Sequence, residues 1–253
     1  MIIDGKAIAA AVIDALPHGT GLQLGVVMDR SHAASDSFVR MKEKVAAQLG
    51  VRVVRYVPED MEQAFADSAG IIVQLPIEGG EALLAMLPPE KDVDALGPAP
   101  LVRAPVAEAV REVLVRHAVE VSGRKAVVVG EGRLVGKPAA QLLRDMGAKV
   151  VVISLEQGSL EELQDADIVV TGAGSPNLIQ PQMLKRGVVL IDAGTSESAG
   201  KLAGDADPSC AGVASLFTPV PGGVGPIAVA MIFKNLFTLV RKENPSDLSR
   251  RGT

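Results

Sequence analysis

A glycine-rich segment in the middle of the chain has the composition of a phosphate-binding loop. Val127-Val-Val-Gly-Glu-Gly-Arg-Leu-Val-Gly-Lys-Pro138 runs from a predicted strand through three glycines into a predicted helix. Small residues let a pyrophosphate approach the backbone, and the N–H groups at a helix start favour an anion. The glycine spacing is one residue longer than in the usual dinucleotide fingerprint, so a tight turn that binds nothing is the alternative interpretation.

Glu156 follows the next predicted strand, at the position where nucleotide-binding domains bind a ribose. A carboxylate there can accept a hydrogen bond from the ribose 2′-hydroxyl, which favours NAD over NADP. The alternative is an acidic side chain in a solvated loop.

Two further polar residues, Lys42 and Gln74, have positions typical of site residues. Lys42 is four residues after Phe38 near the start of a predicted helix, so the two side chains share a face. Gln74 ends a predicted buried strand, and the carboxyl ends of strands line the ligand crevice in open α/β sheets. A solvated helix lysine is the alternative interpretation of Lys42.

Two further segments also carry candidate groups. In Lys91-Asp-Val-Asp94 the two acids are placed either to bind a ligand amine or to cap a loop. Thr218-Pro-Val-Pro-Gly-Gly-Val-Gly-Pro226 predicts a rigid loop that opens the last helix and presents backbone amides to an anion or a ring.

Short apolar runs alternate with helical stretches along the chain, which predicts an α/β fold with parallel strands covered on both faces. The predicted strands are 22–28, 52–57, 70–75, 125–130, 149–154, 167–172 and 188–192. The predicted helices include 6–16, 37–49, 106–117, 137–146 and 226–240. The last helix is apolar almost all round, so we expect it to be buried against the first domain.

We predict two α/β domains, with the boundary near residues 121–124, where a fresh strand–helix–strand unit begins after a proline-rich stretch. Residues 1–120 together with 226–245 form the first domain, and residues 121–225 form the second.

The composition excludes several function classes. Among 253 residues the net charge is −5 and only six side chains are aromatic, so a nucleic-acid partner is not expected. A single cysteine and three scattered histidines predict neither a disulfide nor a metal site. The chain shows no signal peptide and no apolar run of membrane-spanning length, so we expect a cytoplasmic protein without a membrane partner.

The segments taken in order resemble the bifunctional methylenetetrahydrofolate dehydrogenase/methenyltetrahydrofolate cyclohydrolase family over nearly the whole chain. The most specific matches are the segments 89–94 and 218–226. Further matches are the segments 3–9, 39–44, 73–76, 135–138 and 204–207. The resemblance implies a folate-binding catalytic domain followed by a Rossmann-like nucleotide-binding domain, in a homodimer.

The resemblance also implies two reactions. A hydride passes from 5,10-methylenetetrahydrofolate to NADP, and water then converts the methenyl cation to 10-formyltetrahydrofolate. The implied catalytic residues are Lys42, which transfers protons, Gln74, which holds that lysine, and Asp94, which binds the pterin ring. The implied substrate-binding residues are Phe38, Gln74, Leu75, Pro76, Asp94, Pro219, Pro221, Gly222 and Gly223. The expected nucleotide-binding residues are Gly130, Glu131, Gly132, Arg133, Val135, Gly136, Lys137, Glu156, Gly172, Ala173, Gly194 and Thr195.

The chain departs from the family pattern at four places that bear on activity, one of which is Ile227-Ala228 in place of Met-Thr, which removes a hydroxyl and bears on folate affinity. Phe38 stands where the family has Tyr, which removes a hydroxyl near Lys42. Glu131 and Gly132 stand where the family often has Arg and Ser, which makes NAD a rival to NADP. The stretch after Asp94 is shortened, and Ala95 replaces a Gly. These departures motivate the alternative of a catalytically weakened paralogue that binds folate or nucleotide.

Overall fold

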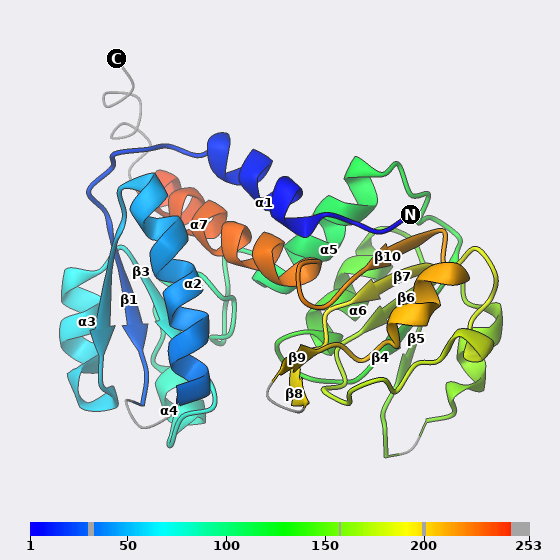
Figure 1. Ribbon diagram of the computed structural model, residues 1–253. Coiled ribbons are helices and arrows are strands. Elements are labelled where there is room, and N and C mark those ends of the chain that lie inside the picture. The colour runs from blue at the N-terminus through cyan, green and yellow to red at the C-terminus, as the bar shows by residue number, and fades with distance from the viewer. Residues whose placement is uncertain (30–32, 157, 199–200, 244–253) are drawn as a thin grey trace. The chain divides into compact units, whose positions relative to one another are not determined.

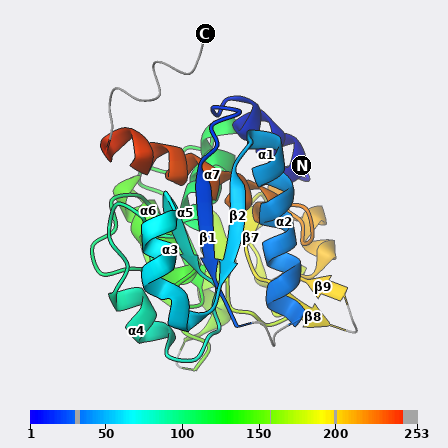
Figure 2. The same ribbon diagram turned by 90° about the vertical axis from the view of Figure 1, so that its left-hand side faces the viewer.

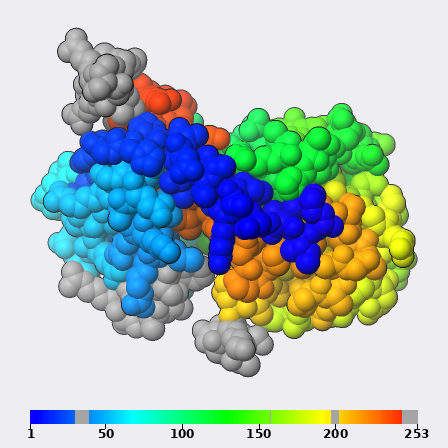
Figure 3. Space-filling model, turned by 45° about the horizontal axis from the view of Figure 1, so that its top comes forward, coloured from blue at the N-terminus to red at the C-terminus, as the bar shows by residue number. Residues whose placement is uncertain are grey.

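The computed structural model describes residues 1–29, 33–156, 158–198 and 201–243. The chain forms two compact units (Figures 1 and 3). The five-stranded unit comprises Met1–Ala9 and Val106–Ala228. The three-stranded unit comprises Ala10–Pro105 and Val229–Thr253.

The three-stranded unit is built on a parallel sheet of order β2-β1-β3. Its strands are β1 (Gln23–Val27), β2 (Arg52–Tyr56) and β3 (Gly70–Val73). Its helices include α2 (Ala33–Leu49), the short 3-10 turn η1 (Pro58–Asp60), α3 (Met61–Asp67) and α4 (Gly80–Ala85). Figure 2 shows the strands between α2 and α3. Because helices cover both faces, every residue of β1 and β3 is buried, as their continuous apolar sequences predict.

The five-stranded unit is built on a parallel sheet of order β10-β7-β6-β4-β5. Its strands are β4 (Lys125–Val129), β5 (Lys149–Ile153), β6 (Ile168–Thr171), β7 (Val189–Asp192) and β10 (Leu216–Thr218). A small antiparallel hairpin, β8 (Ser196–Ser198) and β9 (Lys201–Ala203), lies between β7 and β10 in sequence. The helical segments between strands are α6 (Gly136–Asp145), η2 (Leu160–Asp165), η3 (Pro181–Met183) and η4 (Pro208–Gly212).

Three further helices complete the fold: α1 (Gly5–Asp14), α5 (Pro105–Arg116) and α7 (Val224–Glu243). The buried side chain of Asn235 fixes α7 to the three-stranded unit, since its Nδ2 donates to Val93 O at 2.9 Å and to Arg103 O at 2.8 Å. The C-terminal helix therefore packs on the three-stranded unit. The predicted α/β fold class is confirmed.

By length and composition alone, α7 is apolar enough to cross a membrane, with a mean hydropathy of 1.4 over Val224–Lys242. Of this segment, 61% is buried inside the protein. Such burial is what a core helix of a folded unit shows.

All seven predicted strands form, with bounds that differ by at most two residues at either end. The strand β10 and the hairpin β8–β9 were not predicted, because three-residue strands carry too little periodicity to recognise. The last helix begins at Val224, two residues before Pro226. The compact units divide the chain at 105/106, so that nearly all of α5 belongs with the five-stranded sheet. The functional division into 1–120 with 226–245, and 121–225, stays a prediction.

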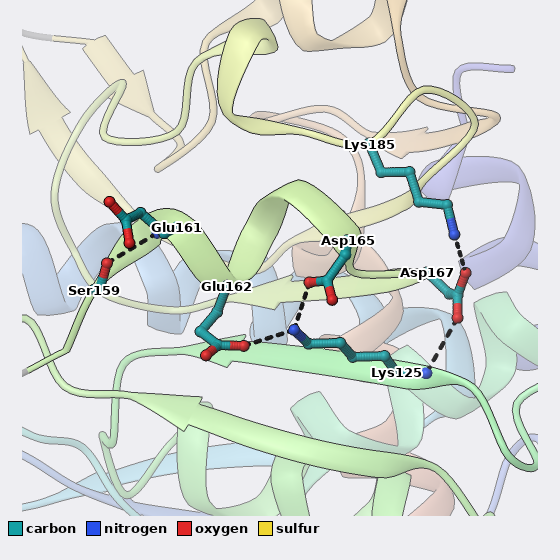
Figure 4. Close-up of polar contacts among 7 residues, drawn as sticks. All are labelled: Lys125, Ser159, Glu161, Glu162, Asp165, Asp167 and Lys185. Atoms are coloured by element: carbon teal, nitrogen blue, oxygen red, sulfur yellow. Dashed lines mark hydrogen bonds and ion pairs between the residues drawn. The ribbon is translucent and has the colours of Figure 1, made fainter.

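Asp167 joins two strands at the amino edge of the five-stranded sheet (Figure 4). Its carboxylate accepts from Lys185 Nζ at 2.6 Å and from Lys125 N at 3.1 Å, and it forms an ion pair with Arg124 at 3.7 Å. The hydrogen bond from Lys185 is the largest of the effects that lower the pKa of Asp167.

A lowered carboxyl pKa adds stability above the ordinary Asp pKa of 3.8, and this stability is lost as the pH falls through the lowered value. We therefore expect Asp167→Asn to reduce the free energy of unfolding at pH 7 by roughly 1 kcal/mol. The difference from the wild type shrinks toward pH 3, as urea titrations at the two pH values will measure. Glu59→Gln, at an exposed position, is the control. An equal loss at both pH values would contradict the ionic role.

Candidate functional site

Lys42 lies on the buried face of α2. Val39, Lys42, Ala46 and Leu49 recur at helical spacing and are 0%, 8%, 1% and 0% exposed. The lysine therefore occupies a position in an apolar stripe. Burial lowers the pKa of Lys42, because the charged ammonium is costly to remove from water, while the nearby carboxylate of Asp94 opposes this effect.

Gln74 holds the Lys42 ammonium. The residue directly follows β3, and its backbone N donates to Val27 O at 2.8 Å, which fixes it to β1. The side-chain Nε2 donates to Leu75 O at 3.2 Å, so that Oε1 is left to accept from Lys42 Nζ at 2.6 Å. An amide oxygen binds the ammonium without the charge of a carboxylate, so it positions the lysine and does not hold its proton as firmly.

Asp94 forms the third member of this cluster. Burial raises the pKa of the Asp94 carboxyl to about 6, the positive charge of Lys42 lowers it, and the carboxylate of Asp92 raises it further. Burial thus moves both Lys42 and Asp94 toward their neutral forms. Groups whose pKa values are displaced in this way are typical of acid–base sites.

The neighbours Lys91 and Asp92 have structural partners. Lys91 Nζ donates to the carbonyls of Phe65 and Ser68, the latter at 2.9 Å, where α3 ends. Asp92, 1% exposed, accepts from Leu96 N at 3.2 Å and Gly97 N at 2.7 Å. Of the two acids, Asp92 therefore caps the following loop, whereas Asp94 is the one whose charge acts on Lys42.

Ala95 has a left-handed backbone, with φ +56°. This conformation costs a residue with a Cβ roughly 1 kcal/mol relative to glycine. The two hydrogen bonds that Asp92 accepts from the next turn hold the loop in this geometry directly beside Asp94.

The other folate-contact candidates of this unit lie next to these residues in sequence. Leu75 and Pro76 follow Gln74 and are joined to each other by a cis peptide bond, and both are at least partly exposed. The backbone of Phe38 belongs to α2, while its side chain lies outside the described residues.

The glycine loop between β4 and α6 is closed tightly on itself. A Cβ at Gly136 would lie 2.0 Å from Gly130 O, so only glycine fits there. No side chain caps α6, and no acidic residue lies in its first turn. Lys137 N donates to Gly132 O at 3.1 Å and Pro138 carries no N–H, so the room for a pyrophosphate lies beside Gly132, where a Cβ would meet open space.

The loop after β6 lies directly against this glycine loop. A Cβ on Gly172 would lie 2.2 Å from Val135 Cγ1, and a Cβ on Gly130 would lie 2.8 Å from Gly172 O. The next residue, Ala173, shares a partner with the loop after β7, because Asp205 accepts from Ala173 N and lies against Gly194. The structure thus brings the predicted residues of three loops together at the carboxyl edge of the sheet, with Thr195 exposed beside Gly194.

Two acids, Glu131 and Glu156, are exposed at this same edge. Glu131 directly follows Gly130 after β4, and Glu156 comes three residues after the end of the neighbouring strand β5. Arg133 and Lys137, the basic candidates of the glycine loop, are exposed too.

The proline-rich loop before α7 belongs to the five-stranded unit. Pro219 O accepts from Gly223 N at 2.7 Å, Gly222 O accepts from Gly5 N at 2.9 Å, and the Val220–Pro221 peptide is cis. These bonds explain the shape of the loop without a ligand. A substrate contact by Pro219, Pro221, Gly222 or Gly223 stays a prediction.

Two features of the site were not predicted from the sequence. The apolar stripe at 39, 42, 46 and 49 is a readable signal that Lys42 is buried. The buried carboxylates Asp192 and Asp205 behind the loops were not singled out, although Asp205 lies in the segment 204–207 that contributes to the resemblance. In the described part of the chain, no group of three or more His, Cys, Asp or Glu side chains is placed to hold a metal ion.

Comparison with known proteins identifies the family. Residues 104–244 match the family model for the tetrahydrofolate dehydrogenase/cyclohydrolase NAD(P)-binding domain. The bifunctional protein FolD of Halothermothrix orenii is 36% identical, with 92% of this chain and 95% of that protein covered. The FolD protein of Lacticaseibacillus casei is 32% identical, with 95% and 97% covered.

Solved structures agree with the sequence comparison. The Trypanosoma brucei dehydrogenase-cyclohydrolase, complexed with NADP and an inhibitor, has a TM-score of 0.86 at 30% identity and covers 96% of this chain and 98% of its own. The Campylobacter jejuni enzyme has a TM-score of 0.89 at 27% identity, with 96% and 99% covered. The chain belongs to the tetrahydrofolate dehydrogenase/cyclohydrolase family.

Proposed function

We propose that this protein oxidises 5,10-methylenetetrahydrofolate to the 5,10-methenyl cation with a nicotinamide dinucleotide, and hydrolyses the cation to 10-formyltetrahydrofolate. The observation that carries the proposal is the buried Lys42 ammonium, bound by Gln74 Oε1 at 2.6 Å beside Asp94, in a member of this family.

Lys42 is the proton-transfer group of the hydrolysis. Water that adds to the methenyl carbon must lose a proton, and the N5–carbon bond breaks as N5 gains one. The net reaction consumes one water and releases one proton. A lysine with a lowered pKa can take the first proton and return it to N5, while Gln74 keeps the amine in place.

Asp94 binds the pterin ring in this proposal. With a pKa of about 6, the carboxyl is largely ionised at pH 7, so it can accept hydrogen bonds from ring N–H groups. Such charge-assisted bonds orient the substrate as well as bind it.

The nicotinamide dinucleotide accepts the hydride, and the five-stranded unit would hold it. The open space beside Gly132 in the glycine loop fits a pyrophosphate that approaches the backbone before α6. NADP in the T. brucei relative supports NADP as the cofactor. The exposed carboxylates of Glu131 and Glu156 favour NAD instead, because they would repel a 2′-phosphate.

The test is a paired spectrophotometric assay with 5,10-methylenetetrahydrofolate and either NADP or NAD. Reduced nicotinamide and the methenyl intermediate are followed separately. Cofactor reduction followed by enzymatic decay of the intermediate would support both activities. Decay at the background rate would leave only the dehydrogenase. Absence of both reactions would favour a weakened paralogue that binds folate or nucleotide.

Phe38→Tyr tests whether the hydroxyl that is missing at position 38, where the family has tyrosine, limits hydrolysis. Position 38 is one helical turn before Lys42, so a restored hydroxyl is expected to raise the cyclohydrolase rate about threefold to tenfold through one added hydrogen bond. Methenyltetrahydrofolate decay measures this rate, with dehydrogenase activity as the internal reference. An unchanged or lower rate would indicate a site rebuilt around phenylalanine.

We also propose that the protein acts as a cytoplasmic homodimer without nucleic-acid or membrane partners. The acidic net charge of −5 and the family resemblance support these points. Sedimentation equilibrium measures the oligomeric state.

A further inference from the structure

Two fully buried carboxylates lie behind the loops at the carboxyl edge of the five-stranded sheet. Asp192 ends β7 and Asp205 follows β9, and both residues are 0% exposed. Buried carboxylates are unfavourable unless they accept several hydrogen bonds, so their partners indicate what they do.

Asp205 holds the loop that follows β6. Its Oδ2 accepts from Thr171 Oγ1 at 2.7 Å and from Ala173 N at 2.6 Å, and its Oδ1 accepts from Ser175 N at 2.8 Å. One side chain therefore fixes the end of β6 and the two backbone amides that come just after it.

Asp192 holds the segments on the other side. Its Oδ1 accepts from Gly194 N at 2.9 Å and Asp205 N at 3.2 Å, and its Oδ2 accepts from Ala206 N at 2.9 Å. Its own N donates to Thr218 Oγ1 at 2.7 Å, which adds β10 to the network. Asp192 and Asp205 thus link the ends of β6 and β7 through their carboxylates, and the backbone N of Asp192 adds the end of β10.

Glycines bring the backbone close enough for this arrangement. A Cβ on Gly194 would lie 2.3 Å from Asp205 Cγ, and a Cβ on Gly204 would lie 2.2 Å from Asp192 Oδ2. The loop after β7 is therefore pressed against the carboxylate that orders the loop after β6.

The tied loops occupy the part of the edge where one half of a dinucleotide would lie. The glycine loop after β4 suits the pyrophosphate, and the end of β5 is the usual place for the adenosine ribose. Since β6 and β7 lie on the side of β4 away from β5, the nicotinamide half would extend over their loops. A Cβ on Gly130 would lie 2.8 Å from Gly172 O, so the glycine loop after β4 lies directly against the loop after β6.

We propose that Asp192 and Asp205 are positioning residues for the nucleotide. They hold the loops 172–175 and 193–195 in the geometry that receives the nicotinamide half, without touching it themselves. The inference rests on the proposed function for the identity of the ligand, and it predicts that nucleotide affinity depends on these carboxylates separately from the hydrolysis of methenyltetrahydrofolate, which needs no nucleotide.

The experiment measures three quantities on the full chain: the Kd for NAD and for NADP by calorimetry, the hydrolysis rate of methenyltetrahydrofolate, and the urea unfolding midpoint. In Asp205→Asn an amide NH2 group replaces one acceptor oxygen and faces a donor. We expect the Kd of the better nucleotide to rise at least tenfold while hydrolysis stays within twofold. Asp207→Asn, at the outward-facing acid two residues later, is the matched control and leaves the Kd unchanged.

Thr171→Val keeps the inference testable if Asp205→Asn does not fold. It preserves side-chain shape and removes only the hydroxyl that donates to Asp205, so a threefold to tenfold rise in Kd is expected. An unchanged Kd in Thr171→Val, or equal losses of binding and hydrolysis, would overturn the positioning role. A wild type that binds nucleotide but converts no folate would contradict the proposed function alone, while the Kd values still decide the inference.

Discussion

Replacing Lys42 by methionine is expected to lower the cyclohydrolase rate by roughly 10³-fold, within the range that general acid–base groups contribute. Methionine has a similar length and fits the apolar stripe of Val39, Ala46 and Leu49. It also removes an ammonium whose burial is unfavourable, so the free energy of unfolding should not fall. Stopped assays of methenyltetrahydrofolate decay and urea titrations measure the two effects.

The same substitution has a second expected consequence at Asp94. The positive charge of Lys42 lowers the pKa of this carboxyl, so its loss raises that pKa further above 6 and weakens folate binding at neutral pH. Lys44→Met, at an exposed position on the same helix, is the control and should retain activity. Unchanged hydrolysis with unchanged folate affinity in Lys42→Met would refute the assignment.

Replacing Glu131 by arginine is expected to shift selectivity toward NADP by about tenfold to a hundredfold. The change removes a carboxylate that repels the 2′-phosphate and adds a guanidinium that can bind it; the two effects together are worth on the order of 1.5–3 kcal/mol. The measurement is the ratio of Kd values for NADP and NAD, together with the ratio of kcat/KM values.

A control variant separates the local effect of the charge at position 131 on the NADP/NAD ratio from the general effect of the net charge of the unit. Glu161→Arg alters the net charge equally at an exposed site in η2 and should leave the ratio unchanged. The effect of Glu131→Arg should weaken as salt is added, because exposed charges are screened. An unaltered ratio in Glu131→Arg would show that residue 131 does not face the 2′ position.

The strands were predictable because buried parallel strands are continuous apolar runs, and seven of them stand out in this sequence. The hairpin β8–β9 and β10 were not, since tertiary contacts stabilise three-residue strands that have little signal of their own. The bounds of the two compact units could not be predicted from the sequence pattern either. They are discontinuous, and which sheet α5 and the chain ends join depends on long-range packing.

The candidate site was predictable to a different degree in each part. The position of Gln74 after a buried strand correctly placed it where the strands end, and the structure shows its hydrogen bond with Lys42. The sequence left open whether Asp92 and Asp94 act together. Only the folded loop shows that Asp92 accepts from Leu96 N and Gly97 N, and that the charges of Asp94 and Lys42 influence each other.

The short segment Lys91–Asp94 has a practical consequence for mutational scanning. Lys91 binds a carbonyl at the C-terminal end of α3, Asp92 holds the following turn, and Asp94 is the proposed folate-binding group. In a screen that records only growth or turnover, substitutions of these three charged residues would give the same low score. Pairing each activity score with protein abundance would separate them. Variants at 91 and 92 should lose both together, whereas variants at 94 should lose turnover at normal abundance.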